Sequence, residues 1–174
     1  TLPDAVERAM DEAGIAAAHL AGNSLGGYVA LQLAERGRAL SVTAFAPGGG
    51  WGTDAGRHET LDFFAELRRP IEHAAPYADR IASTAAGRRR ATQYIVADGR
   101  DLPEELVAHQ IRGAAACDAL PLIEVAREGY PLDAEKVACP LRIVWGTDDA
   151  VLRWPSAAER WQVLFPHADW VVLD

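Results

Sequence analysis

A serine set between glycines is the feature of this chain most suited to chemistry. Gly22-Asn23-Ser24-Leu25-Gly26 matches the pattern G-x-S-x-G, in which a strand turns sharply into a helix and presents the serine hydroxyl above the strand ends. We expect the two glycines to let strand and helix approach without a Cβ clash. The helix N-terminus offers unpaired backbone N–H groups that favour developing negative charge. The spacing predicts a nucleophile elbow at Ser24.

The residues on either side of this pattern favour the same interpretation. Residues 18–21 form a short apolar run typical of a buried parallel strand. Residues 26–36 have helical periodicity and end at Gly37, a common helix-terminating residue. Strand, turn and helix therefore follow in the required order. The alternative is a glycine-rich turn in some other α/β protein.

Strand-like and helical runs also alternate near both ends of the chain. A strand–helix–strand succession predicts parallel strands joined by a right-handed crossover. The expected helices span residues 2–14, 24–36 and 156–164, and the expected strands span residues 15–21, 40–46, 140–146 and 168–173.

The middle of the chain has a different pattern, with few strand-like runs. Its expected helices span residues 60–69, 77–84, 88–96 and 103–128. We interpret residues 51–137 as a helical cap lying over the strand ends, between core segments 1–50 and 138–174. Some apolar cap residues are candidate pocket walls, although packing within the cap is the better account of most of them. They are Phe63, Phe64, Tyr77, Tyr94, Ile95, Leu120, Leu122 and Ile123.

Composition excludes several classes of function. A net charge of −8 argues against binding to nucleic acid or to anionic membranes, and no apolar run is long enough to span a membrane. The basic run 88–90 is best explained as a solvated helix face. Cys117 and Cys139 form no C-x-x-C pair, and no histidines have metal-site spacing. We expect no metal, no cofactor and a cytoplasmic location.

Three motifs together resemble the α/β-hydrolase fold superfamily, in its capped serine-hydrolase type that includes esterases, lactonases and carbon–carbon bond hydrolases. They are residues 22–27 at the serine, residues 139–149 with a strand and an acidic loop, and residues 165–174 with a closing strand. The resemblance implies a partial α/β-hydrolase fold. That fold has a parallel sheet of about four strands, helices on both faces and a helical cap.

The resemblance also implies roles for individual residues. Ser24 is the expected nucleophile, and the backbone N–H of Leu25 is one expected oxyanion-hole donor. Asp149 is the expected triad acid, with Asp148 as its competitor. Adjacent side chains of extended backbone point in opposite directions, so only one of these carboxylates can reach a histidine. If Asp149 is the acid, we expect Asp148 to cap the turn.

None of the five histidines suits the role of general base. In this family the histidine follows the acid, whereas His167 precedes the last strand and His19 lies inside a strand that should bury it. His58, His73 and His109 are more typical of the cap surface. The loop that supplies a second oxyanion donor is also absent. We therefore expect this chain to be the central and C-terminal part of a longer hydrolase, with its first strand at an unpaired edge.

The expected activity is hydrolysis of a carboxylic ester, or of a related acyl or carbon–carbon bond, in a small apolar substrate. A serine at position 24 argues against haloalkane dehalogenase and epoxide hydrolase chemistry, since those members of the superfamily carry aspartate there. The alternative from another class is a non-catalytic protein that keeps the fold and binds a small ligand. The oligomeric state is left open.

Overall fold

The computed structural model describes residues 1–174 and divides the chain into two compact units. The core unit comprises residues 1–57 and 129–174, and the helical unit comprises residues 58–128. The helical unit is shorter at both ends than the cap expected at 51–137. None of the helices combines the length and apolar character needed to cross a membrane.

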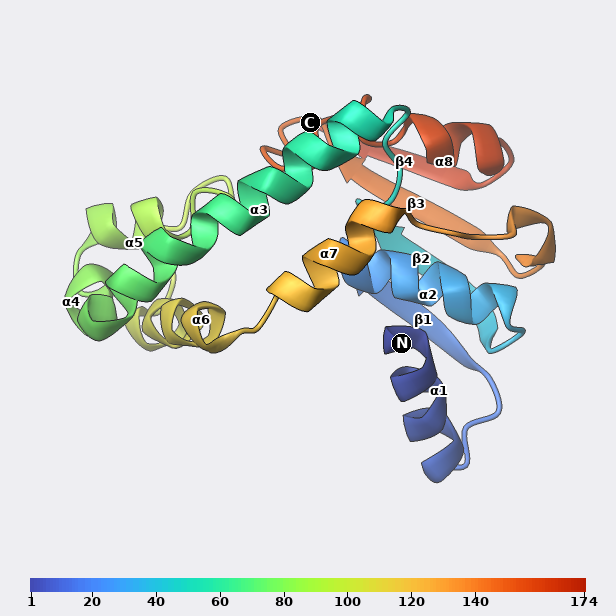
Figure 1. The fold of residues 1–174 in the computed structure, drawn as a ribbon, viewed down its shortest axis with the longest axis horizontal. Coiled ribbons are helices and arrows are strands. Elements are labelled where there is room, and N and C mark those ends of the chain that lie inside the picture. Colours follow the sequence, from blue (N-terminus) through green and yellow to red (C-terminus); the bar gives the residue numbers. More distant parts are fainter. The chain divides into compact units, whose positions relative to one another are not determined.

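A four-stranded parallel sheet forms the centre of the core unit (Figure 1). Its order is β1-β2-β3-β4, and every neighbouring pair is parallel. The strands are β1 (Ala18–Asn23), β2 (Ala39–Phe45), β3 (Leu141–Gly146) and β4 (Asp169–Leu173). The predicted number, direction and sequential order of the strands are confirmed, and β1 lies at an edge as expected.

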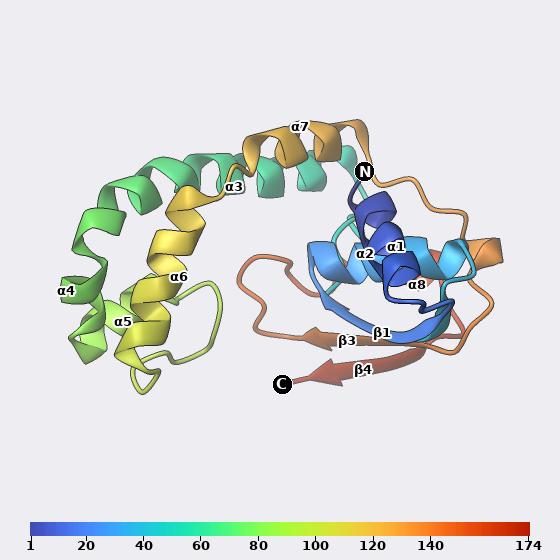
Figure 2. The same ribbon diagram turned by 90° about the horizontal axis from the view of Figure 1, so that it is seen from below.

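The helices of the core unit cover one face of this sheet (Figure 2). They are α1 (Leu2–Glu12), α2 (Leu25–Glu35) and α8 (Glu159–Leu164). Trp161 of α8 stacks on Tyr28 of α2, with ring centroids 6.4 Å apart, and Arg36 just after α2 donates hydrogen bonds of 2.8 Å to carboxylates of α1.

The expectation of helices on both faces is therefore wrong for the core unit. The chain crosses the sheet in one direction, from β1 to β4. Right-handed crossovers in a constant direction place α2 and α8 on the same face. Helices on the opposite face would require the strand order to reverse.

The covered face carries the hydrophobic core. Val42 and Ala44 of β2 and Ile143 and Trp145 of β3 are all buried there. On the other face His19 is exposed, and its Nδ1 lies 2.8 Å from the Ser41 hydroxyl oxygen. The predicted burial of His19 is wrong, because its side chain points to the face without helices.

The helical unit has a small core of its own. That core consists of Ala78, Ala82, Val107, Ala108 and Ile111. The helices are α3 (Asp54–Ala74), which begins in the core unit, α4 (Ala78–Ala82), α5 (Ala85–Ala91), α6 (Glu104–Ala116) and α7 (Leu120–Glu128). The 3-10 turn η1 (Ala75–Tyr77) joins α3 to α4, and in the core unit η2 (Ala134–Lys136) precedes β3.

The long helix predicted over 103–128 is two helices in the structure. The chain leaves α6 at Cys117, whose backbone is extended (φ −75°, ψ 122°), and α7 starts at Leu120. Pro121 is the second residue of α7. Proline is tolerated in the first turn of a helix but disrupts a helix interior, so a new helix begins there.

Candidate active site

Ser24 lies at the turn between β1 and α2 with φ 51° and ψ −117°. Positive φ is rare for a residue with a side chain, and such strain persists only where the surroundings enforce it. The Ser24 N–H donates to the Phe45 carbonyl at 2.9 Å, and the Ser24 carbonyl accepts from the Gly48 N–H at 2.9 Å. The predicted elbow geometry is confirmed.

The glycines around the elbow differ in what they contribute. A Cβ on Gly22 would lie 2.2 Å from the Gly26 carbonyl oxygen, and a Cβ on Gly27 would lie 3.0 Å from Cα of Pro47. A Cβ on Gly26 would meet nothing within 4 Å. The close approach of strand and helix therefore depends on Gly22 and Gly27, and the expected need for glycine at position 26 is wrong.

Leu25 is the first residue of α2. The first N–H groups of a helix have no acceptor within that helix, so the Leu25 N–H is available beside Ser24. Backbone N–H groups at helix N-termini are groups that oxyanion holes use as donors.

Asp149 lies in the loop after β3 and is half-buried. Its Oδ1 accepts from the backbone N–H groups of Val151 at 2.9 Å and Leu152 at 2.8 Å. Both bonds use the same oxygen, so Oδ2 is available to accept from another group. Asp148 is exposed and makes neither bond. The turn-capping role expected for Asp148 is therefore wrong, because Asp149 caps the turn itself.

Ser24 and Asp149 both lie at the carboxyl ends of the parallel strands. Ser24 follows β1 and Asp149 follows β3, with β2 between them. Parallel strands share the direction of their carboxyl ends, and two strand spacings amount to about 10 Å. An imidazole placed between the two side chains is of the right size to connect them.

No histidine of the core unit occupies that place. His19 lies on β1, five residues before Ser24, and bonds Ser41 instead. His167 precedes β4 and therefore lies at the amino ends of the strands, whereas Asp149 lies at their carboxyl ends. The other three histidines, His58, His73 and His109, are exposed on α3 and α6 in the helical unit. The structure also gathers no three acidic, histidine or cysteine side chains able to hold a metal ion.

A second strained turn follows β2, beside the elbow. Ala46 has φ 38°, and Gly49 has φ 90°. From sequence alone, the run Pro47-Gly48-Gly49-Gly50 indicates only the end of the strand. Its contact with Ser24 through Gly48 makes this run part of the candidate site. Three consecutive glycines were the only local signal of such a close approach.

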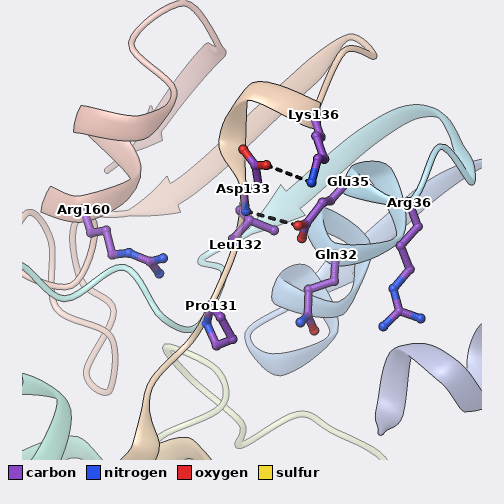
Figure 3. A pocket seen from close by; sticks show the side chains of 8 residues that line it. All are labelled: Gln32, Glu35, Arg36, Pro131, Leu132, Asp133, Lys136 and Arg160. Atoms are coloured by element: carbon purple, nitrogen blue, oxygen red, sulfur yellow. Dashed lines mark hydrogen bonds and ion pairs between the residues drawn. The ribbon is translucent and has the colours of Figure 1, made fainter.

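A groove of the core unit is lined by residues of α2, of the segment before β3 and of α8 (Figure 3). It has a volume of about 930 Å³ and contains an ion pair of 2.9 Å between Lys136 and Asp133. The α2 residues in its wall start at Gln32, about 10 Å along the helix from the elbow. We therefore do not assign it to the serine site. Its lining is Gln32, Glu35, Arg36, Pro131, Leu132, Asp133, Lys136 and Arg160.

This fold and elbow define a class of proteins, and comparison with known families identifies the same class. The model of the alpha/beta hydrolase family matches residues 2–174, so the chain belongs to that family. The resemblance seen in the three motifs is confirmed.

Particular relatives match over different extents. The epoxide hydrolase EphH of Mycobacterium tuberculosis is 60% identical over 50 residues, which cover 29% of this chain and 23% of that protein. A 2-hydroxy-6-oxo-6-phenylhexa-2,4-dienoate hydrolase from Rhodococcus sp. strain RHA1 has a TM-score of 0.60 at 20% identity, covering 95% of this chain and 58% of that one. An enol-lactonase from Burkholderia xenovorans LB400 has a TM-score of 0.51 at 22% identity, covering 99% and 63%. The chain thus spans about three fifths of the solved structures that it resembles.

Proposed function

We propose that the protein containing this chain is a serine hydrolase that cleaves a carboxylic ester, or a related acyl or carbon–carbon bond. The observation that carries this proposal is the strained backbone of Ser24 at the β1–α2 turn. Membership of the alpha/beta hydrolase family supports the same reading.

The proposed chemistry follows from the atoms around the turn. The Ser24 hydroxyl attacks the carbonyl carbon while a histidine takes its proton, and the carbonyl oxygen gains negative charge. The Leu25 N–H donates a hydrogen bond to that oxygen. Asp149 Oδ2 accepts from the histidine and orients it. The histidine then protonates the leaving group, and water releases the acyl product by the same route.

The base and the second oxyanion donor are proposed to lie outside residues 1–174. The position of each histidine in the core unit supports this, because neither lies between Ser24 and Asp149. The 174-residue polypeptide alone should therefore turn over esters only slightly above background. Loss of a triad member costs about 10⁴ to 10⁶ in kcat.

The substrate is proposed to be a small, apolar molecule with an electrophilic carbonyl. Two proteins sharing the fold are named for a lactone and for an oxo-dienoate, and both compounds contain such a carbon. Of the eight candidate wall residues, only Ile123 is buried and Phe63 is half-buried, whereas the other six are exposed on the helical unit. The ring of Phe63 lies edge-on to Tyr94 at 5.0 Å and to Phe64 at 5.6 Å.

Epoxide hydrolysis is the second candidate, because a relative with 60% identity over 50 residues carries that name. In this superfamily epoxide opening uses an aspartate at the elbow, where this chain has Ser24. A serine alkoxide would form a stable ether with an epoxide, whereas a carboxylate forms an ester that water can cleave. Ester or acyl cleavage is therefore the better match to Ser24.

A non-catalytic ligand-binding protein remains the alternative from another class. Strain at Ser24 and an available carboxylate oxygen on Asp149 favour catalysis over binding alone. We also propose a cytoplasmic location, because Cys117 and Cys139 are unpaired thiols suited to a reducing compartment.

The test is hydrolysis of p-nitrophenyl butyrate and of styrene oxide by the full-length protein that contains this chain. We expect ester turnover that falls by at least about 10⁴ in Ser24→Ala. The matched control is Ser83→Ala, at an exposed hydroxyl of the helical unit. Ester turnover that survives Ser24→Ala would refute the proposal, and turnover of styrene oxide alone would favour the second candidate.

A further inference from the structure

Helix α8 holds the glycine run after β2 through three hydrogen bonds. Arg160 Nη1 donates to the Gly49 carbonyl at 2.8 Å, and the Arg160 backbone N–H donates to the Gly50 carbonyl at 2.9 Å. Trp161 Nε1 donates to the Pro47 carbonyl at 2.9 Å. Two side chains more than 100 residues further along the chain thus fix this turn.

The turn and α8 are in close contact. A Cβ on Gly50 would lie 2.2 Å from the Ala157 carbonyl oxygen and 2.4 Å from Trp161 Cδ1. Gly49 has φ 90°, a conformation that disfavours any side chain. Residues 49 and 50 therefore have little freedom to move while α8 stays in place.

Arg160 is an unusual residue for such a position. It is half-buried, it takes part in none of the ion pairs of the structure, and its guanidinium lies 4.6 Å from the Trp161 ring centroid. Burial lowers the pKa of this guanidinium. Placing a cation there without a carboxylate is unfavourable, so a packing role alone would be met better by an apolar side chain.

The turn at residues 47–50 also fixes one peptide group of the elbow, the one between Ser24 and Leu25. The Gly48 N–H donates to the Ser24 carbonyl at 2.9 Å, and the Tyr28 N–H donates to the same oxygen at 3.1 Å. The Ser24 carbonyl and the Leu25 N–H belong to a single planar trans peptide, so they point in opposite directions. A bond that fixes the carbonyl therefore also fixes the direction of the Leu25 N–H.

We propose that Arg160 is a positioning residue for the oxyanion hole. Its guanidinium holds the Gly49 carbonyl, which keeps the Gly48 N–H on the Ser24 carbonyl and aims the Leu25 N–H at the developing oxyanion. This inference rests on the proposed hydrolase function and adds to it a residue remote from the reacting atoms.

The test uses Arg160→Met and Arg160→Lys in the full-length protein, with Arg153→Met as the matched control at an exposed arginine just before α8. We measure kcat and KM with p-nitrophenyl butyrate, the thermal midpoint, and inhibition by a trifluoromethyl ketone that mimics the oxyanion. Removal of a complete oxyanion donor costs about 10² to 10³ in kcat, so misaiming one should cost Arg160→Met about tenfold or more.

The expected result has three parts. In Arg160→Met the kcat falls while KM changes less than about twofold, and the affinity for the ketone falls in parallel with kcat/KM. Arg160→Lys recovers part of the loss, since one donor and the charge remain. Added methylguanidine raises the kcat of Arg160→Met but leaves Arg153→Met unchanged.

Several results would overturn the inference. One is an Arg160→Met enzyme with wild-type kcat and ketone affinity. Another is a loss of kcat in Arg160→Met that a lower thermal midpoint explains by itself. Such a loss would be reversed neither in Arg160→Lys nor by added methylguanidine. If Arg160→Met does not fold, Arg160→Lys decides by its ketone affinity. A wild-type protein without Ser24-dependent turnover would instead refute the proposed function itself.

Discussion

Asp149 has two tasks in this account, and its two carboxylate oxygens separate them. Oδ1 caps the turn after β3 through Val151 and Leu152, whereas Oδ2 is proposed to orient the histidine. Asp149→Asn keeps an acceptor for the turn but removes the charge. We expect it to lower kcat of the full-length protein by about 10⁴, with Asp148→Asn costing much less. Steady-state kinetics with the opposite ranking would assign the acid to Asp148.

Tyr28 links α2 to the segment before β3 and gives the fold a specific pH dependence. Its hydroxyl donates to the Pro131 carbonyl at 2.7 Å, and burial raises its pKa to about 12. The unfolded tyrosine has a pKa of about 10. Between pH 10 and 12 the unfolded state therefore binds fewer protons than the folded state, and stability falls as pH rises.

The measurement is urea unfolding of the full-length protein that contains this chain, at pH 9.0 and at pH 11.0. The loss of unfolding free energy between these pH values should be smaller in Tyr28→Phe than in the wild type. Tyr77→Phe, at an exposed ring, is the matched control and should keep the wild-type loss. If Tyr28→Phe and the wild type lose the same unfolding free energy between these pH values, the raised pKa of Tyr28 is not the origin of the loss.

Sequence alone could predict the residues whose roles are local. Ser24 was predicted because a strained turn needs its neighbours within two residues, and the elbow was found as expected. Arg160 and Tyr28 were missed because each bonds a carbonyl more than 100 residues away. No periodicity records such a contact. That Asp149 and not Asp148 caps the turn also depends on loop geometry that the sequence does not show.

At the scale of elements, the β1–α2 junction depends more on Gly22 than on Gly26. Gly22→Ala would place a Cβ 2.2 Å from the Gly26 carbonyl oxygen, whereas Gly26→Ala meets open space. Overpacking of a rigid site costs roughly 1–3 kcal/mol. Alanine gains up to about 1 kcal/mol over glycine inside a helix. Gly22→Ala should therefore destabilise the fold and Gly26→Ala should not.

Denaturant unfolding of the two variants side by side checks this prediction. Each carries the same added methyl group, four residues from the other, so their difference isolates the contact at the strand. Equal unfolding free energies would show that the junction relaxes to accept either side chain.

Elements with strong local signals were predicted to within a few residues. The four strands each carried an apolar run bounded by turn residues, and all four were found. The helix over 103–128 was predicted as one because its apolar periodicity continues across the break. Pro121 was the signal for two helices, since it fits only the first turn of the second one.

At the scale of the whole molecule, the core unit leaves part of its sheet uncovered. Phe45 is 42% exposed and Leu173 is 54% exposed, and β1 is an edge strand paired only with β2. Open apolar edges favour pairing between chains. We expect the isolated 174-residue chain to associate or to be poorly soluble, and Ala21→Lys on β1 to reduce association. Sedimentation velocity showing a stable wild-type monomer would count against this prediction.

The layer order of the molecule was only partly predictable. Sequential parallel strands followed from the repeated strand–helix succession, and right-handed crossovers then place the core helices on one face. The expectation of two covered faces came from family resemblance and from no feature of these residues. The physical rule for crossovers was the better guide.

The central claim is that Ser24 is the nucleophile. The most direct measurement is intact-mass and peptide mass spectrometry of the full-length protein after treatment with a fluorophosphonate, which phosphonylates a serine activated by a base. We predict one adduct per chain, located on Ser24 and absent from Ser24→Ala. An adduct on another residue, or ester turnover that continues after Ser24 is fully phosphonylated, would contradict the account.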